Sequence, residues 1–250
     1  REALRLTGIE SGVEITTIAD IPGQGTGLGS SSSVTVGLLN AMHAFQGREV
    51  SKEQLAEEAC QIEIDTLGAP IGRQDQYAAS FGGVNSIRFG GNRVQVEPIE
   101  VSEGLSKKLS ESFTLVFTGL TRSASKVLSE QSDDESDKNS RMREIRKHAD
   151  EAASHIENGD LDSLGAILNQ TWKSKRGVSS MVTNTQIDDL YERVISSGAL
   201  GAKLLGAGNG GFLLVCGNRQ LRGILQRELG EGHRMFPLEI DFSGSSIIFG

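Results

Sequence analysis

The sequence predicts an α+β protein, and three observations support this fold class. A glycine-rich stretch runs into consecutive serines and then into an amphipathic helical pattern, between residues 23 and 45. Helical patterns recur between residues 138 and 197. Residues 201–249 then alternate in the order strand, turn, strand, helix, strand. This order, coming after helices, is typical of an α+β sandwich of the ferredoxin-like kind.

The first residues indicate a chain that opens in the middle of a fold. Residues 1–9 have the pattern of the end of a helix, and Val13–Ile18 alternates like a strand. The glycines of Gly23–Gly29 then occupy every second position and lead into the serines Ser30–Ser33. Behind them, apolar residues recur at helical spacing: Val34, Leu38, Met42 and Phe45.

The serines therefore fall in the first turn of a helix, where backbone N–H groups lack intrahelical partners. Glycine lets the preceding backbone adopt positive φ angles and approach a ligand closely. Free N–H groups, hydroxyl donors and the helix dipole together favour a polyphosphate. A flexible Gly/Ser linker is the alternative, but linkers do not lead directly into an amphipathic helix. The stretch is not a P-loop, because no lysine follows its last glycine.

Two helices and a hairpin are predicted next. Ser51–Gln54 has the pattern of a capping box and opens a helix that ends near Thr66. A second glycine-rich turn, Gly68–Gly72, leads into a short helix over Gln74–Phe81. Residues 84–89 and 93–99 flank Gly90-Gly91-Asn92 as a hairpin.

The second half of the chain begins after a polar passage, residues 100–112, which is the candidate boundary between domains 1–111 and 112–250. The acidic run 133–137 is predicted to be a solvated loop. The predicted strands are 113–118, 201–206, 211–216, 235–242 and 245–249. One predicted helix begins after residue 124. The others span 138–157, 160–174, 185–197 (capped by Asn184) and 218–229.

The composition excludes some classes of partner and favours one cellular compartment. The net charge of −8 argues against a nucleic-acid partner. No apolar run has membrane-spanning length, and the first residues lack a signal-peptide pattern. Cys60 and Cys216 lie in apolar stretches and are predicted to be buried free thiols, which favours a reducing, cytoplasmic compartment.

A third glycine pattern, Gly206–Gly211, fits Gly-x-Gly-x-x-Gly letter by letter. A dinucleotide site would need a helix after it, whereas residues 212–216 have the pattern of a strand. Two interpretations stay open: a tight hairpin, or a glycine loop at the rim of an active site.

These motifs resemble those of the GHMP kinases, the family of galactokinase, homoserine kinase and mevalonate kinase. Pro22 with Gly27–Ser31 is similar to their second motif, and Lys203–Gly211 is similar to their third. Gly68-x-Pro70-x-Gly72-x-x-Asp75-Gln76 resembles a galactokinase pattern. The resemblance implies a two-domain fold, with an N-terminal part like ribosomal protein S5 domain 2 and a ferredoxin-like C-terminal part. The family's first motif is not found here, so we expect the N-terminal segment to be absent from this chain.

The resemblance also implies an ATP- and Mg²⁺-dependent site. Asp75 would accept the proton of the attacking sugar hydroxyl; from its position alone, a helix cap or dipole partner is the alternative. Mg²⁺ would be held by Ser31 and Glu63, with Asp65 as the rival of Glu63. The ATP phosphates would contact Gly25, Gly27, Leu28, Gly29, Ser30, Ser31 and Ser32. The substrate would contact Asp75, Arg122, Gly208 and Gly210.

Within the family, the chain looks most like the D-glycero-D-manno-heptose 7-phosphate kinases, which phosphorylate the anomeric hydroxyl of their sugar. The segments that carry this likeness are Gly29–Ser33, Gly72–Ala79 and Thr118–Ala124. Arg122 is the expected cation for the distal phosphate, with Lys173, Lys175 and Arg176 in reserve. The alternatives are a kinase for fucose or galactose, and a non-catalytic nucleotide or sugar sensor. The expected partners are ATP and a sugar phosphate, and a homodimer is left open.

Overall fold

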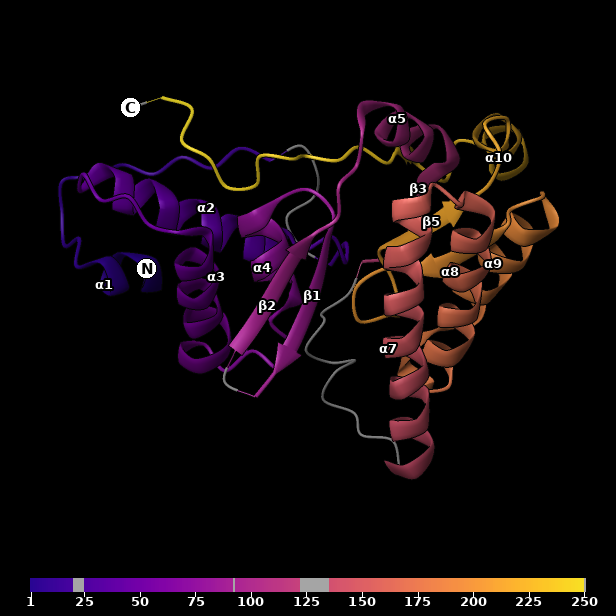
Figure 1. Cartoon of the computed structure of the whole chain (residues 1–250), viewed down its shortest axis with the longest axis horizontal. Helices are drawn as coiled ribbons and strands as arrows, with labels where there is room; N and C mark the ends of the chain where they lie inside the picture. Colours follow the sequence, from indigo (N-terminus) through magenta and orange to yellow (C-terminus); the bar gives the residue numbers. More distant parts are fainter. Residues whose placement is uncertain (20–24, 92, 122–134, 250) are drawn as a thin grey trace. The chain divides into compact units, whose positions relative to one another are not determined.

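The computed structural model describes residues 1–19, 25–91, 93–121 and 135–249 (Figure 1). The chain divides into two compact units. The first comprises Arg1–Gln24, Gly29–Gly83 and Asp241–Gly250, and the second comprises Gly25–Leu28 and Val84–Ile240. This division by contacts does not follow the boundary expected at 111/112, and the assignment of 1–111 and 112–250 as family domains stays a prediction.

The first unit is helical. A small core of aliphatic side chains, including Val36, Leu39 and Leu55, joins its helices. The elements are α1 (Glu2–Thr7), α2 (Ser30–Phe45), α3 (Lys52–Cys60), the π-helical turn η1 (Gln61–Thr66) and α4 (Gln74–Phe81). The predicted capping box is confirmed at its first bond, because Ser51 Oγ accepts from the Gln54 N–H at 3.1 Å.

Helix α2 begins where the sequence predicts, but its buried face coincides only in part with the predicted one: Met42 is buried and Leu38 packs against the core. Val34 is 44% exposed and Phe45 is 65% exposed, although both were expected on the apolar side. Besides Met42, the buried side chains are Ser32, Val36, Leu39 and His43. Periodicity analysis counts apolar residues, so it misses a buried stripe whose two ends are a serine and a histidine.

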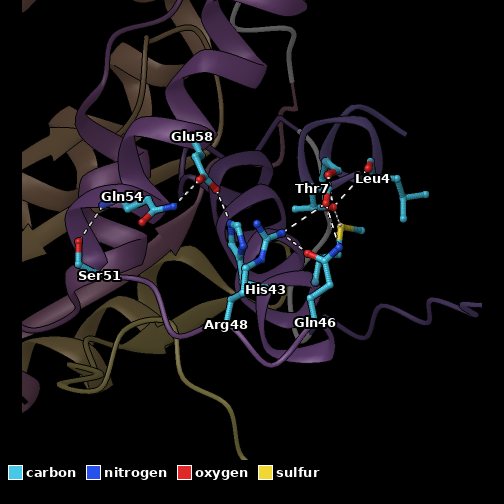
Figure 2. A network of polar contacts seen from close by, with 10 residues as sticks. Leu4, Thr7, His43, Gln46, Arg48, Ser51, Gln54 and Glu58 are labelled. Atoms are coloured by element: carbon cyan, nitrogen blue, oxygen red, sulfur yellow. Dashed lines mark hydrogen bonds and ion pairs between the residues drawn. The ribbon is translucent and has the colours of Figure 1, made fainter. Parts of the chain in front are cut away.

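Polar contacts tie the C-terminal end of α2 to its two neighbours, as Figure 2 shows. His43 Nε2 lies 2.6 Å from Glu58 Oε2 on α3, and Glu58 also accepts from Gln54 Nε2 at 2.8 Å. Gln46, just after the helix, donates from Nε2 to the carbonyl of Thr7 on α1 at 3.0 Å. Helix α2 is thus anchored at its C-terminal end, and its N-terminal end carries the serines.

Two predicted strands of the first unit are wrong. Residues 13–18 and 245–249 contain no strand in the structure. The backbone–backbone hydrogen bonds of the C-terminal segment go singly to the end of α4 and the residues just after it: Gly83 N–H donates to Asp241 O at 2.7 Å, and Ser245 N–H donates to Ser80 O at 3.3 Å. A strand needs a ladder of such bonds with an extended neighbour, and an alternating sequence alone does not supply one.

The second unit contains the predicted hairpin and a four-stranded sheet. The hairpin pairs β1 (Asn85–Gly90) with β2 (Arg93–Pro98), and Arg88 of β1 contacts Asp150 at 2.8 Å. In the sheet, neighbouring strands are antiparallel in the order β4-β5-β3-β6. These strands are β3 (Phe113–Phe117), β4 (Gly201–Leu204), β5 (Phe212–Cys216) and β6 (Met235–Pro237). The last is shorter than the strand predicted near 235–242.

Side chains alternate between the two faces of this sheet. Val116, Leu204 and Leu213 contribute to a cluster with α9 and α10, whereas Phe113 and Cys216 contribute to a cluster with α5 and α8. The helices of the unit are α5 (Glu103–Ser112), α7 (Glu135–Asn158), α8 (Leu161–Arg176), the 3₁₀ turn η2 (Ser180–Val182), α9 (Thr185–Ser196) and α10 (Leu221–Leu229). The α+β character expected for this part is confirmed.

Two helical segments lie where the sequence predicts no helix. The polar passage 100–112 contains helix α5, which begins at a serine cap: Ser102 Oγ accepts from the Leu105 N–H at 3.2 Å. Residues 135–137 of the acidic run belong to the first turn of α7 rather than to a loop. The helix expected after residue 124 lies outside the described residues. In the described part of the chain, no helix combines the length and apolarity needed to cross a bilayer.

Candidate active site

Glu63 is the centre of a polar cluster in the first unit. It lies in the π-helical turn η1 and is only 3% exposed. Ser31 donates from its hydroxyl to Glu63 Oε1, and Ser32 Oγ donates to Oε2 at 2.7 Å. Gln76, buried on α4, donates from Nε2 to Oε2 at 2.6 Å. Three segments far apart in the sequence therefore meet at one carboxylate.

The cluster has the donor set of a site for a hard cation. Among the residues that the structure describes, the Glu63 carboxylate accepts only from neutral hydroxyl and amide groups, and from no cationic side chain. A buried carboxylate without a countercharge is costly, and Mg²⁺ needs only one or two protein oxygens besides phosphate and water. Asp65, the rival of Glu63, has an exposed side chain. The described residues contain no group of three or more His, Cys, Asp or Glu suited to a metal.

Asp75 lies in the first turn of α4, beside the beginning of α2. A Cβ placed on Gly29 would lie 3.3 Å from Asp75 Cβ and Cγ, so the glycine backbone approaches this side chain closely. Burial by surrounding protein atoms, and then the charge of Glu63, raise the pKa of Asp75. Its side chain also keeps a solvent-exposed surface, and solvent there screens the effect. The N-cap of α4 is Arg73, without a side-chain cap bond, so Asp75 is not the cap.

The glycine–serine stretch, Gly25–Ser32, has the backbone that the sequence predicts. Gly25, Gly27 and Gly29 have φ angles of 75°, 75° and 70°, which belong to the left-handed region that favours glycine. Gly29 is the N-cap of α2, and Ser30 is the first residue of the helix. The serine hydroxyls and the N–H groups of this first turn therefore lie where the anion-binding end of a helix is expected. Pro22 and Gly23 lie outside the described residues.

In the second unit, Gly25–Leu28 packs against the glycine turn, which we define as Gly206–Gly211. The Phe212 N–H donates to Thr26 O at 3.2 Å. A Cβ on Gly27 would lie 3.0 Å from Leu205 O, and a Cβ on Gly211 would overlap Thr26 O. Neither position can carry a side chain without moving the other segment. The turn also precedes β5, so the expectation of a glycine turn followed by a strand is confirmed.

Of the remaining predicted residues, Gly208, Gly210 and Lys175 lie in or contact this turn. Gly208 and Gly210 are buried, and a Cβ on Gly208 would overlap the backbone of Val182. Arg122 lies outside the described residues, but the carbonyl of Leu120 accepts from the Gly211 N–H at 2.8 Å. Of the reserve cations, Lys175 donates to Gly206 O, Arg176 contacts Asp188 at 3.2 Å, and Lys173 is exposed.

Three residues of these clusters make contacts that the sequence does not predict. Gln76 was quoted only as part of a motif, and Ser32 only as a phosphate contact, yet both donate to Glu63. Asn209 lies inside the third glycine pattern and was given no role, yet it accepts from Asn184 Nδ2 at 2.6 Å. The motif spacing named Gln76, but nothing local could have paired Asn184 with Asn209.

Comparison with known proteins matches both ends of the chain to one family. The model of the GHMP kinases N terminal domain matches residues 1–83, and that of the GHMP kinases C terminal domain matches residues 152–232. A D-glycero-alpha-D-manno-heptose 7-phosphate kinase from Campylobacter jejuni is 34% identical over 79% of this chain and 59% of its own length. A bifunctional fucokinase/GDP-fucose pyrophosphorylase from Arabidopsis thaliana is 30% identical over 96% of this chain and 24% of its own length.

Solved structures share the fold. A D-glycero-D-manno-heptose 1-phosphate kinase from Bacteroides thetaiotaomicron superposes with a TM-score of 0.71 at 24% identity, covering 88% of this chain and 62% of that one. A putative sugar kinase from Campylobacter jejuni gives 0.70 at 29% identity, covering 90% and 65%. The chain thus spans about three fifths of the heptose 7-phosphate kinase and of these two solved structures, and about a quarter of the bifunctional relative. Its two parts match the two halves of a single family fold, and the chain belongs to the GHMP kinases.

Proposed function

We propose that the chain carries the catalytic machinery of an ATP-dependent sugar kinase. The reaction moves the γ-phosphate of ATP to the anomeric hydroxyl of a sugar phosphate, D-glycero-D-manno-heptose 7-phosphate. The observation that carries this proposal is the buried carboxylate of Glu63, joined to Ser31, Ser32 and Gln76, with Asp75 nearby. A sensor would need neither carboxylate, which argues against that alternative.

The phosphates of ATP would bind the glycine–serine stretch. Gly25, Gly27, Leu28 and Gly29 offer a backbone that a polyphosphate can approach, and Ser30, Ser31 and Ser32 offer the N-terminus of α2. Ser31 and Glu63 would hold Mg²⁺, which neutralises phosphate charge when it is bound. The donor set fits this ion because both residues present oxygen, and their side chains already touch.

Asp75 would act on the sugar. Its carboxylate accepts the proton of the anomeric hydroxyl as that oxygen forms its bond to the γ-phosphorus, while the bond from phosphorus to the ADP oxygen breaks. A raised pKa makes this carboxylate a better proton acceptor than an ordinary aspartate. Gly208 and Gly210 would line the sugar side, and Arg122, or Lys175 at the glycine turn, would meet the distal phosphate.

A second candidate substrate is an unphosphorylated sugar such as fucose or galactose. The observation that favours it is the fucokinase relative, whose match extends over 96% of this chain. The heptose phosphate is preferred because the heptose 7-phosphate kinase is more similar, at 34% identity against 30%. We further propose a cytoplasmic enzyme, in line with two buried free thiols, and a homodimer that light scattering would test.

The test offers the full-length protein ATP–Mg²⁺ with heptose 7-phosphate, galactose, fucose and mannose side by side, and measures ADP release. We expect turnover with the heptose phosphate, and loss of that turnover in Asp75→Asn. Arg122→Ala should raise the KM of the sugar phosphate about ten- to hundredfold, because a charge-assisted bond to phosphate is lost. Preference for an unphosphorylated hexose would defeat the heptose assignment, and absence of turnover with every sugar would defeat the kinase.

A further inference from the structure

Asn209 lies in the glycine turn and has a φ of 57°. Among the described residues, it is the one non-glycine residue with a positive φ. Asparagine tolerates this left-handed backbone better than most residues. Its N–H donates to Val182 O at 2.6 Å. Its side-chain Oδ1 accepts from Asn184 Nδ2 at 2.6 Å, and Asn184 Oδ1 in turn accepts from the Ile187 N–H at 3.0 Å as the N-cap of α9.

This chain of bonds fixes which way both amides face. The two ends of an asparagine amide are told apart by their hydrogen-bond partners. The Ile187 N–H can only donate, so the atom of Asn184 that meets it is the oxygen. The other end of Asn184 is therefore a donor, and the atom of Asn209 that meets it must be an oxygen. It follows that Asn209 directs its own NH₂ group away from Asn184.

That NH₂ group is available at the glycine turn. Asn209 is half-buried, and its Nδ2 has no acceptor among the residues that the structure describes. Asn209 contacts the turn's flank at Val182, whereas Thr26 of the glycine–serine stretch contacts the turn at Gly211 and Phe212. The free donor is thus on a different part of the turn from the one that contacts the expected nucleotide segment.

We propose that Asn209 Nδ2 donates a hydrogen bond to an acceptor oxygen of the sugar substrate, and that Asn184 is the positioning residue that keeps this donor outward. The proposal rests on the proposed function, because it takes the glycine turn as the sugar side of the site. A glycine at this position would leave the turn without a side-chain donor. Asn209 is therefore a specificity residue: it favours a sugar with an acceptor oxygen at this point.

Two single-atom exchanges test the orientation. Asn209→Asp keeps the size and the contact with Asn184 Nδ2 but replaces the outward donor with an acceptor. Asn184→Asp still caps α9, because aspartate and asparagine cap equally well. Its second carboxylate oxygen attracts Asn209 Nδ2, so the amide of Asn209 turns and presents its oxygen outward, with residue 209 itself unchanged. Ser102→Asp is the control, since it adds the same charge at the N-cap of α5 in the same unit.

The measurements are the KM values of the full-length protein for heptose 7-phosphate and for ATP, together with the side-chain amide resonance of Asn209 during titration with heptose 7-phosphate. We expect the sugar KM to rise about tenfold in both asparagine variants. The ATP KM should stay within about twofold, and Ser102→Asp should match the parent. The Asn209 resonance should shift on titration in the parent.

The outcomes separate this inference from the proposed function. If the parent turns over heptose 7-phosphate and neither variant changes its KM, the inference is wrong and the kinase assignment stands. If the parent shows no turnover but the Asn209 resonance shifts on titration, and the shift is lost in Asn184→Asp, the inference stands without the kinase assignment. Neither turnover nor a shift would overturn both.

Discussion

At the scale of single residues, Glu63 and Asp75 are the two acidic side chains on which the proposed chemistry depends. Glu63 is buried and fixed by three donors, whereas Asp75 lies beside a glycine backbone and has no side-chain hydrogen bond to any residue that the structure describes. A fixed carboxylate suits a metal ligand, because its oxygens are already oriented. A carboxylate with a raised pKa and a solvent-exposed surface suits proton transfer.

Substitution of the two residues should therefore have different kinetic effects. Asp75→Asn removes the proton acceptor, and kcat should fall about 10²–10⁴-fold while ADP still binds. Glu63→Gln should instead raise the Mg²⁺ concentration needed for half-maximal rate. Asp65→Asn, an exposed neighbour, is the matched control and should leave both unchanged. Steady-state kinetics over a range of Mg²⁺ measures this, and near-normal turnover by Asp75→Asn would refute the assignment of the base.

Lys203 on β4 is a desolvated lysine, and burial lowers its pKa. Above the unfolded-state pKa it is neutral in both states and contributes no pH dependence. As the pH falls from there through the folded-state pKa, the unfolded chain binds the proton more readily, so stability decreases. At neutral pH the residue is therefore destabilising.

Lys203→Met should accordingly raise the melting temperature at pH 7 by a few degrees, since about 1 kcal/mol corresponds to roughly 2–4 °C in a chain of this size. The gain should shrink as the pH approaches about 10.4, the ordinary lysine pKa. Lys108→Met, at an exposed position on α5, is the control and should show no such trend. Thermal unfolding at several pH values measures the difference, and a gain that does not vary with pH would exclude the desolvation argument.

At the scale of the element, helix α2 carries candidate-site residues at one end and structural contacts at the other. Its N-terminus carries the serines that contact Glu63, and its C-terminal end is held by His43 and Gln46. Its two glycines have opposite requirements. Gly29 precedes the helix with φ of 70° and approaches Asp75, whereas Gly37 lies in the helix interior, where an added Cβ would meet nothing within 4 Å.

The same substitution at these two positions should thus give opposite results. Gly37→Ala should stabilise the protein by about 1 kcal/mol, because glycine is a poor helix former, and should leave ADP affinity unchanged. Gly29→Ala forces a Cβ into left-handed backbone and against Asp75, so it should destabilise the helix start and weaken ADP binding. Calorimetric titration with ADP and thermal unfolding measure both effects. Equal ADP affinity in the two folded variants would count against a phosphate site at Gly29.

At the scale of the whole chain, the first unit takes in the C-terminal segment as well as residues near the N-terminus. Lys52 Nζ donates to Phe81 O at 2.7 Å and to Ser243 O at 3.0 Å, and Asn40 Nδ2 donates to Ser245 Oγ at 3.0 Å. At the closest point, a Cβ on Gly244 would overlap the backbone at Ser80 and Phe81. The stability of this unit should therefore depend on residues that follow the second unit in sequence.

Gly244→Ala tests this dependence against Gly47→Ala. Both glycines have positive φ, 64° and 69°, but a Cβ on Gly47 would meet nothing within 4 Å. Gly47→Ala should lower the free energy of unfolding by about 1 kcal/mol, the cost of left-handed backbone. Gly244→Ala should cost about 1–3 kcal/mol more, because it also displaces the docked segment. Urea unfolding measures both, and an equal cost would mean that the segment does not stabilise the unit.

The sequence by itself determined the features that depend on near neighbours. Ser51 and Asn184 mark helix starts because a capping side chain acts on residues only two or three positions away. The glycine motifs named the segments of the candidate site for the same reason, since a positive φ is a local property of the backbone. The order of helices and strands in the second unit followed from periodicity and turn residues.

The tertiary structure alone decided what depends on distant partners. Ser31 and Ser32 meet Glu63, 32 and 31 residues away, and Asn184 meets Asn209, 25 residues away. It also decided that α2 buries Ser32 and His43, and that residues 13–18 and 245–249 form no strand. A polar side chain is buried only where another segment satisfies its hydrogen bonds, and an extended segment becomes a strand only beside another one. The sequence around a residue does not identify the distant segment that will bond to it or pair with it.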